Sequence, residues 1–227
     1  MAKRSGIFDM IGPVMIGPSS SHTAGVVRIG RVAKRIFGKH LAIESVQITF
    51  YNSFARTYEG HGSDRAILAG LLDFKTDDAR IKNALDLATQ ESISYTFKAV
   101  GNASIYHPNT VKVEVQGNGR SVEVIGESLG GGVINIASLD DFKADFSASN
   151  HTLIIKATDE RGVIAFISNI LAQENCNIAT MSVSRKGKND LACHVIEMDS
   201  GIPQITMDYI RHINWCKELI YIPDIDF

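Results

Sequence analysis

The sequence predicts an α+β fold with two domains, a mixed α/β domain followed by a smaller β-α-β-β-α-β domain. Apolar residues at helical spacing alternate with segments in which every second residue is apolar. The 227 residues, 44% of them hydrophobic, can supply two cores. The polar stretch 138–150 is typical of a linker. We therefore expect domains over residues 1–149 and 150–227.

The first half is predicted to alternate helices and strands. In chain order we expect a helix over 26–37, a strand over 46–50, a helix from Ser63, a helix over 77–90, strands around 111–115 and 122–124, and a last strand over 133–136. Gly117-Asn118-Gly119 predicts the turn of a hairpin. Residues 52–62 and 106–109 are expected to be loops.

The second half shows a more regular pattern. Strands are predicted over 152–157, 178–184, 191–198 and 216–222, with helices over 162–174 and 203–210. The order β-α-β-β-α-β is that of the ferredoxin-like, or split β-α-β, fold.

Composition excludes several functional classes. A formal net charge of -2 without a basic stripe argues against nucleic acid and acidic membrane surfaces, and favours a small polar ligand. No apolar run approaches the roughly 18 residues of a membrane span, and we expect a cytoplasmic chain because no secretory signal is recognisable. Three cysteines without a CxxC pattern predict neither a disulfide framework nor a metal site in this chain.

The segment 17–25 is the strongest functional signal. Ser19, Ser20, Ser21, His22 and Thr23 lie between a Gly-Pro turn and an amphipathic helix. A helix N-terminus offers unpaired N–H groups and a positive dipole end, which suit an anionic ligand. A simple serine N-cap is the structural alternative, but it needs only one serine.

A second polar cluster contains His61 between Gly60 and Gly62. Histidine is suited to proton transfer near neutral pH, so we favour His61 as a general base, with His22 as its rival. A hydrogen bond from His61 to Asp64 or to a helix end is the structural alternative.

Three further features receive smaller roles. Asn109, after His107-Pro108, is either a turn residue or a substrate contact. Arg28 and Arg31 are interpreted as the solvated face of a helix. A serine hydrolase using His22 is disfavoured because no GxSxG elbow is present.

The last 75 or so residues resemble an ACT domain. The resemblance is carried by Asp159-Glu160-Arg161-Gly162 after the first strand, and by residues 175–178. It implies self-association through sheets and a candidate amino-acid site near Asp159, Gly162 and Asn175. A domain that only dimerises is the alternative, because fold analogy does not identify a ligand.

Nearly the whole chain resembles the beta chain of bacterial iron-sulfur L-serine dehydratase. The motifs lie at residues 8–9, 11–13, 16–23, 60–64 and 107–109. The family implies an alpha chain that carries a 4Fe-4S cluster, conversion of L-serine to pyruvate and ammonia in amino-acid catabolism and gluconeogenesis, and an N-terminal fold related to the allosteric substrate-binding domain of phosphoglycerate dehydrogenases.

Two functional interpretations follow. In the first, the chain is one subunit of an L-serine ammonia-lyase and has no metal of its own. His61 and His22 are then catalytic, and the substrate contacts are Ser19, Ser20, Ser21, Thr23, Gly62 and Asn109. In the second, it is a free-standing amino-acid sensor without catalysis.

Overall fold

The computed structural model describes residues 12–225, which form two compact units divided between Asp140 and Asp141. The predicted fold class is confirmed, because helices and strands alternate in the first unit and the second has the order β-α-β-β-α-β. The division reflects contacts rather than independent folding, so the domain boundary at residue 149 stays a prediction.

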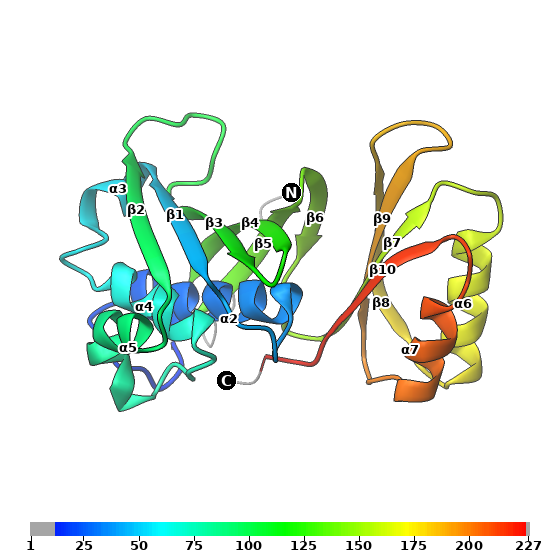
Figure 1. Cartoon of the computed structure of the whole chain (residues 1–227), viewed down its shortest axis with the longest axis horizontal. Coiled ribbons are helices and arrows are strands. Elements are labelled where there is room, and N and C mark those ends of the chain that lie inside the picture. Colours follow the sequence, from blue (N-terminus) through cyan, green and yellow to red (C-terminus); the bar gives the residue numbers. More distant parts are fainter. Residues whose placement is uncertain (1–11, 226–227) are drawn as a thin grey trace. The chain divides into compact units, whose positions relative to one another are not determined.

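The first unit is built on a mixed sheet with helices packed against it (Figure 1). Its elements are a π-helical turn (Ser20–Ala24), α2 (Gly25–Phe37), β1 (Ser45–Tyr51), α3 (Asn52–Thr57), α4 (Ser63–Leu71), a 3-10 helix (Ala79–Asn83), α5 (Ala84–Gln90), β2 (Ser94–Val100), β3 (Thr110–Gly117), β4 (Arg120–Gly130) and β5 (Val133–Leu139). Within this unit the strand order is β2-β1-β3-β4-β5, and β2 pairs in parallel with β1. The strand that follows, β6 (Phe142–Phe146), belongs to the second unit. Helix α2 packs on β3, β4 and β5, and α4 packs on α2.

Three segments differ from the prediction. Residues 52–57, expected to be a loop, form α3, which is too short to show a helical period but buries Phe54. The edge strand β2 was not predicted, although Tyr95, Phe97 and Ala99 alternate with polar residues in its sequence. Most of its residues are exposed. The expected linker contains β6, in which Phe142, Ala144 and Phe146 alternate as buried residues.

The two arginines interpreted as a solvated face are buried instead, since Arg28 is 4% and Arg31 8% exposed. The Arg28 guanidinium donates to the carbonyl of Gly132, and Arg31 pairs with Asp73. Helix α2 is covered on nearly all sides, so its polar residues find their partners inside the protein.

Helices α2 and α4 touch through their backbones at Gly30 and Gly70. A Cβ atom at Gly70 would lie 2.1 Å from the carbonyl oxygen of Val27, and one at Gly30 would lie 2.5 Å from that of Ile67. The Ser63 hydroxyl, at the start of α4, donates to the carbonyl of His22 at 2.7 Å. The N-termini of the two helices therefore lie side by side.

The predicted hairpin turn is confirmed. Gly117 pairs with Arg120, and the two residues between them, Asn118 and Gly119, have φ angles of 50° and 69°. Positive φ at both central positions is the type I′ geometry that suits the twist of an antiparallel pair.

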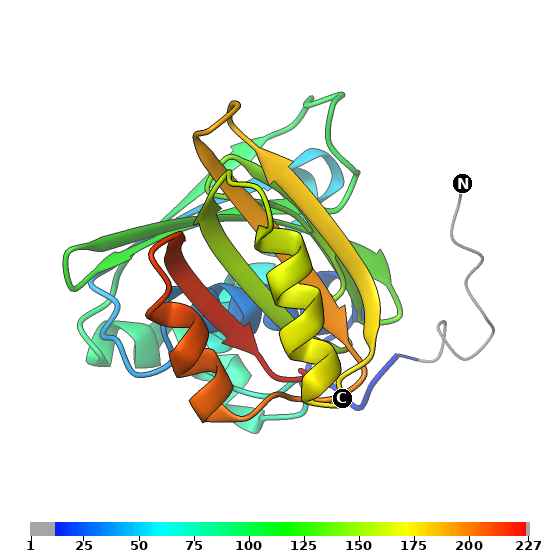
Figure 2. The ribbon, with the colours of Figure 1, turned by 90° about the vertical axis from the view of Figure 1, so that its right-hand side faces the viewer.

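The second unit contains β7 (His151–Thr158), α6 (Val163–Gln173), β8 (Ile178–Arg185), β9 (Leu191–Met198), α7 (Gln204–Arg211) and β10 (Cys216–Ile222). Its sheet order is β10-β7-β9-β8 with antiparallel neighbours, and both helices cover one face (Figure 2). This is the split β-α-β topology predicted from the sequence.

His194 on β9 is a buried histidine in that unit. Neither ring nitrogen has a hydrogen-bond partner among residues 12–225. Burial lowers its pKa, and the charge of Asp159 opposes that shift only in part. The ring is therefore neutral at neutral pH and packs as part of the core, alongside Ile196 and Met198.

The backbone contact between α2 and α4 should not tolerate a methyl group added at Gly70. Gly70→Ala gains roughly 1 kcal/mol of helix propensity but overpacks a backbone contact at a cost of about 3 kcal/mol. We expect the free energy of unfolding in urea to fall by about 2 kcal/mol. Gly101→Ala is the control, since its Cβ would meet no atom within 4 Å. Equal stability of the two variants would contradict the backbone contact.

Candidate active site

The structure brings the two candidate histidines together. The ring centroids of His22 and His61 lie 4.7 Å apart, with 36° between their planes. Phe54 of α3 packs edge-on against His22 at 4.8 Å. The serine motif and the Gly-His-Gly turn, which are distant in the sequence, therefore form one site.

The serine hydroxyls fix the ring of His22. Its Nδ1 lies 2.9 Å from Ser21 Oγ and 3.3 Å from Ser19 Oγ. Ser19 Oγ also accepts the backbone N–H of His22 as an N-cap. The Nε2 atom of His22 is buried and has no hydrogen-bond partner within residues 12–225.

Burial lowers the pKa of His22, and the neighbouring His61 lowers it further. Because a lowered histidine pKa favours the uncharged ring, His22 is neutral at neutral pH. A neutral ring can donate one hydrogen bond and accept another, whereas an imidazolium can only donate.

His61 is held by a backbone carbonyl. Its Nδ1 lies 3.2 Å from the carbonyl oxygen of Thr57, and its own carbonyl accepts the Thr23 hydroxyl at 3.3 Å. A carbonyl oxygen can only accept, so Nδ1 carries the proton and Nε2 of the neutral ring keeps its lone pair. Thr57 is the last residue of α3, so the structural alternative of a bond from His61 to a helix end is confirmed. Asp64 instead accepts the backbone N–H of Arg65 at 2.8 Å.

A small cleft of about 160 Å³ opens beside His61. Gly17, Pro18 and Thr23 come from the serine motif, Gly60 to Gly62 from the turn, and Arg65 and Lys82 from the helices that follow. Arg65 and Lys82 were missed by sequence reasoning, because single cations on polar helix faces carry no recognisable pattern.

Four of the predicted contacts do not line the cleft, namely Ser19, Ser20, Ser21 and Asn109. Ser20 and Ser21 belong to the π-helical turn that contains His22, and Ser19 is its N-cap. The carbonyl of Asn109 accepts the backbone N–H of Ser128, whose side chain lies against Gly25. The backbone of Asn109 is therefore tied, through Ser128, to the first turn of α2.

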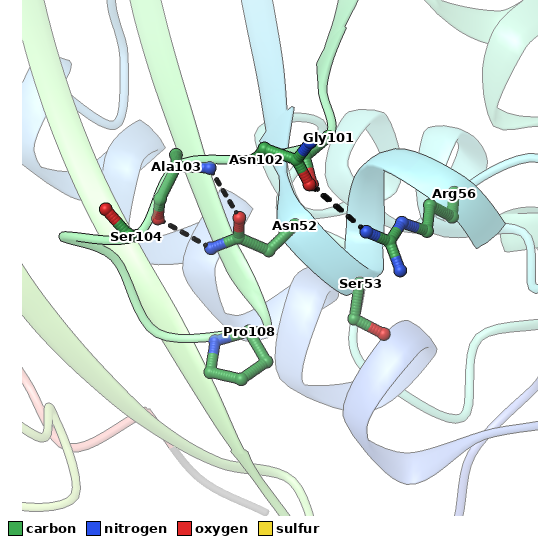
Figure 3. Close-up of a pocket in the computed structure, with 8 residues that line it drawn as sticks. All are labelled: Asn52, Ser53, Arg56, Gly101, Asn102, Ala103, Ser104 and Pro108. Atoms are coloured by element: carbon green, nitrogen blue, oxygen red, sulfur yellow. Dashed lines mark hydrogen bonds between the residues drawn. The ribbon is translucent and has the colours of Figure 1, made fainter.

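A second, larger cavity of about 550 Å³ lies between α3 and residues 101–108 (Figure 3). Asn52 has a left-handed φ of 51°, and its amide donates to the carbonyls of Ala103 and Tyr106 at 3.0 and 3.1 Å. Its side-chain oxygen accepts the N–H of Ala103 at 2.7 Å. Asn52 thus fixes the loop that leads into the His-Pro-Asn motif.

The predicted ACT ligand residues are only partly adjacent. Asp159 and Gly162 lie before α6, beside a cavity of about 680 Å³ that Arg161 and Arg185 also line. Asp159 accepts from Arg185 at 3.2 Å. Asn175 follows the other end of α6, roughly 16 Å away along an 11-residue helix.

Residues 12–225 offer no cluster of three or more His, Cys, Asp or Glu side chains that could hold a metal ion. Cys176 and Cys193 are buried and Cys216 is half-buried, all three in the second unit. A search of the same residues finds no helix with the length and apolar character needed to cross a membrane.

A small cleft lined by His61, Arg65 and Lys82, in a chain that also contains a split β-α-β unit, is the arrangement of a metabolic protein that handles a small molecule. The chain belongs to the serine dehydratase beta chain family, which matches residues 6–138. Of the motifs that predicted this family, residues 8–9 and Ile11 lie outside the described part of the structure.

Two relatives extend the likeness over most of the chain. The "Probable L-serine dehydratase, beta chain" of Bacillus subtilis (strain 168) is 44% identical over 93% of this chain and 94% of its own. The "L-serine dehydratase, beta chain" of Peptoniphilus asaccharolyticus is 35% identical over 87% and 88%.

A "D-3-phosphoglycerate dehydrogenase" of Bacillus subtilis is 28% identical over 81% of this chain and 33% of its own. This agrees with the predicted fold relationship. Nothing in these comparisons supports the free-standing sensor.

The role of Asn52 in stabilising the loop 101–108 can be tested directly. Asn52→Ala removes the side-chain hydrogen bonds and places alanine in a left-handed conformation, so we expect a loss of about 2 kcal/mol in unfolding free energy. Asn52→Gly removes the bonds but tolerates the φ angle, and should lose less. Amide exchange across residues 103–109 should accelerate in both variants but not in the control Asn102→Ala. Unchanged amide exchange would show that the Asn52 side chain does not stabilise the loop.

Proposed function

We propose that this chain is the beta subunit of a cytoplasmic L-serine ammonia-lyase and contributes the general base to an active site shared with a separate alpha subunit. One observation carries the proposal. His61 is held through Nδ1 by a carbonyl, which leaves the Nε2 lone pair available, and the residue lines a small cleft together with Arg65 and Lys82. The names of the relatives supply the substrate, L-serine.

The 4Fe-4S cluster expected for the family does not fit the residues of this chain. Such a cluster needs three or four thiolates gathered at one point, and the described residues bring no such group together. We therefore assign the cluster to the alpha subunit and derive no step through it.

The chemistry assigned to this chain is removal of the α-proton. Elimination of water from L-serine requires that this proton leave Cα while the β-hydroxyl departs, and the resulting enamine yields pyruvate and ammonia on hydrolysis. In the proposal, Nε2 of His61 accepts the proton, and the Thr57 carbonyl stabilises the imidazolium that forms by keeping its bond to Nδ1–H.

His22 acts as a neutral partner in this proposal. Its lowered pKa keeps it uncharged and makes it a weaker base than an ordinary histidine, so it is a poor acceptor of the α-proton. Ser19 and Ser21 orient its ring through Nδ1. We keep Ser20, Thr23, Gly62 and Asn109 as substrate contacts.

The test replaces His61 by an isosteric amide. Asn at position 61 can still donate to the Thr57 carbonyl but cannot accept the α-proton, so we expect kcat of the reconstituted two-chain enzyme to fall by roughly 10²–10⁴. Association with the alpha chain and cluster absorption should not change. His22→Asn should reduce kcat less, by about tenfold.

The matched control is His212→Asn. His212 is exposed, lies in the second unit, and contacts the carbonyl four residues earlier through Nδ1, as His61 does. It should retain full turnover. Turnover retained by His61→Asn would exclude the base assignment.

We further propose that the second unit acts as an ACT domain in self-association and in regulation. Its support is the split β-α-β topology and the cavity beside Asp159 and Gly162. Deleting residues 150–227 should change the oligomeric state, or the cooperativity of the rate with L-serine, more than the maximal rate. Sedimentation and rate curves that match those of the intact enzyme would exclude this role.

A further inference from the structure

The cleft beside His61 is positively charged although the chain has a net charge of -2. Arg65, in the first turn of α4, and Lys82, in the 3-10 helix, both line it, and no carboxylate of the described residues does. Neither cationic side chain makes a hydrogen bond or ion pair within residues 12–225. Two like charges therefore line one small space, and Asp64, whose carboxylate Arg65 attracts, is not part of that lining.

The nearest acid in the sequence does not neutralise them by a side-chain contact. Asp64 is 9% exposed, and its carboxylate accepts the backbone N–H of Arg65. Helix α4 begins at Gly62, which has no side-chain cap, so the positive end of the helix adds to the field of the two cations. The field in the cleft favours an anion.

The cleft has a volume of about 160 Å³. A three-carbon acid fits such a space. Thr23 and the open backbone at Gly60 and Gly62 add polar groups with little bulk, and the rest of the lining includes the apolar residues Ile16, Pro18 and Ile81.

We propose that Arg65 and Lys82 bind the carboxylate of the amino-acid substrate and so present its Cα to His61. This inference rests on the proposed function, because it takes the ligand of the cleft to be the reacting amino acid. A carboxylate is the one group of L-serine that is charged opposite to both side chains, and charge-assisted hydrogen bonds are the stronger class. Arg65 and Lys82 are thus specificity determinants for α-amino acids with a free carboxylate.

The first experiment uses the reconstituted two-chain enzyme. Arg65→Gln and Lys82→Gln should each raise KM for L-serine about tenfold and change kcat by no more than about twofold, since the carboxylate is bound equally in ground and transition states. Lys39→Gln, which removes an exposed lysine far from the cleft lining, should leave both constants unchanged.

The second experiment uses the isolated full chain and does not depend on turnover. L-serine should shift the amide resonances of Gly60 and Gly62, while L-serinamide, which lacks the carboxylate, should not. Arg65→Gln should abolish the L-serine shifts.

The outcomes separate the two proposals. Unchanged KM in both variants overturns the inference. Unchanged KM with weakened binding to the alpha chain also overturns it, and shows that the cations meet an acidic surface of that partner. If His61→Asn retains turnover while the L-serine shifts still require Arg65, the base assignment fails and the carboxylate site stands.

Discussion

The backbone contact of α2 with α4 at Gly30 and Gly70 determines where the functional groups lie. His22 and His61 each lie two to three helical turns before one of these glycines, so the contact fixes the separation of both histidines. The bond from Ser63 to the His22 carbonyl closes the same end of the helix pair. Any side chain at Gly70 would separate the helices and move one histidine away from the other.

The same packing determines the charge state of the site. Two helix N-termini lie side by side, and their positive ends disfavour an imidazolium in the space between them. Burial acts on His22 in the same direction and lowers its pKa. One arrangement of helices therefore keeps a histidine neutral and attracts an anion, and both properties suit proton abstraction from a carboxylate-bearing substrate.

Prediction from the sequence succeeded where apolar residues recur with the helical period of 3.6 or the strand period of 2. Helix α2, the β3–β4 hairpin and the whole β-α-β-β-α-β order were predicted for that reason. It failed for Arg28 and Arg31, which are polar yet buried because the environment overrides the pattern. It also missed β2, an exposed edge strand in which Tyr95, Phe97 and Ala99 do alternate with polar residues. The histidines could be chosen from their glycine and serine neighbours, but their pairing and the cations Arg65 and Lys82 required tertiary structure.

In the proposed function, the site supplies a base and a charged cleft, and the second half of the elimination needs a group that helps the β-hydroxyl leave. The lining of the cleft contains His61, Arg65 and Lys82. The proposal assigns substrate binding and deprotonation to these groups, and assigns activation of the leaving group to the alpha subunit. In that division of the reaction, each subunit supplies one function. The exposed position of Arg65 and Lys82 is consistent with that division, because a cleft that a partner completes must stay open in the separate chain.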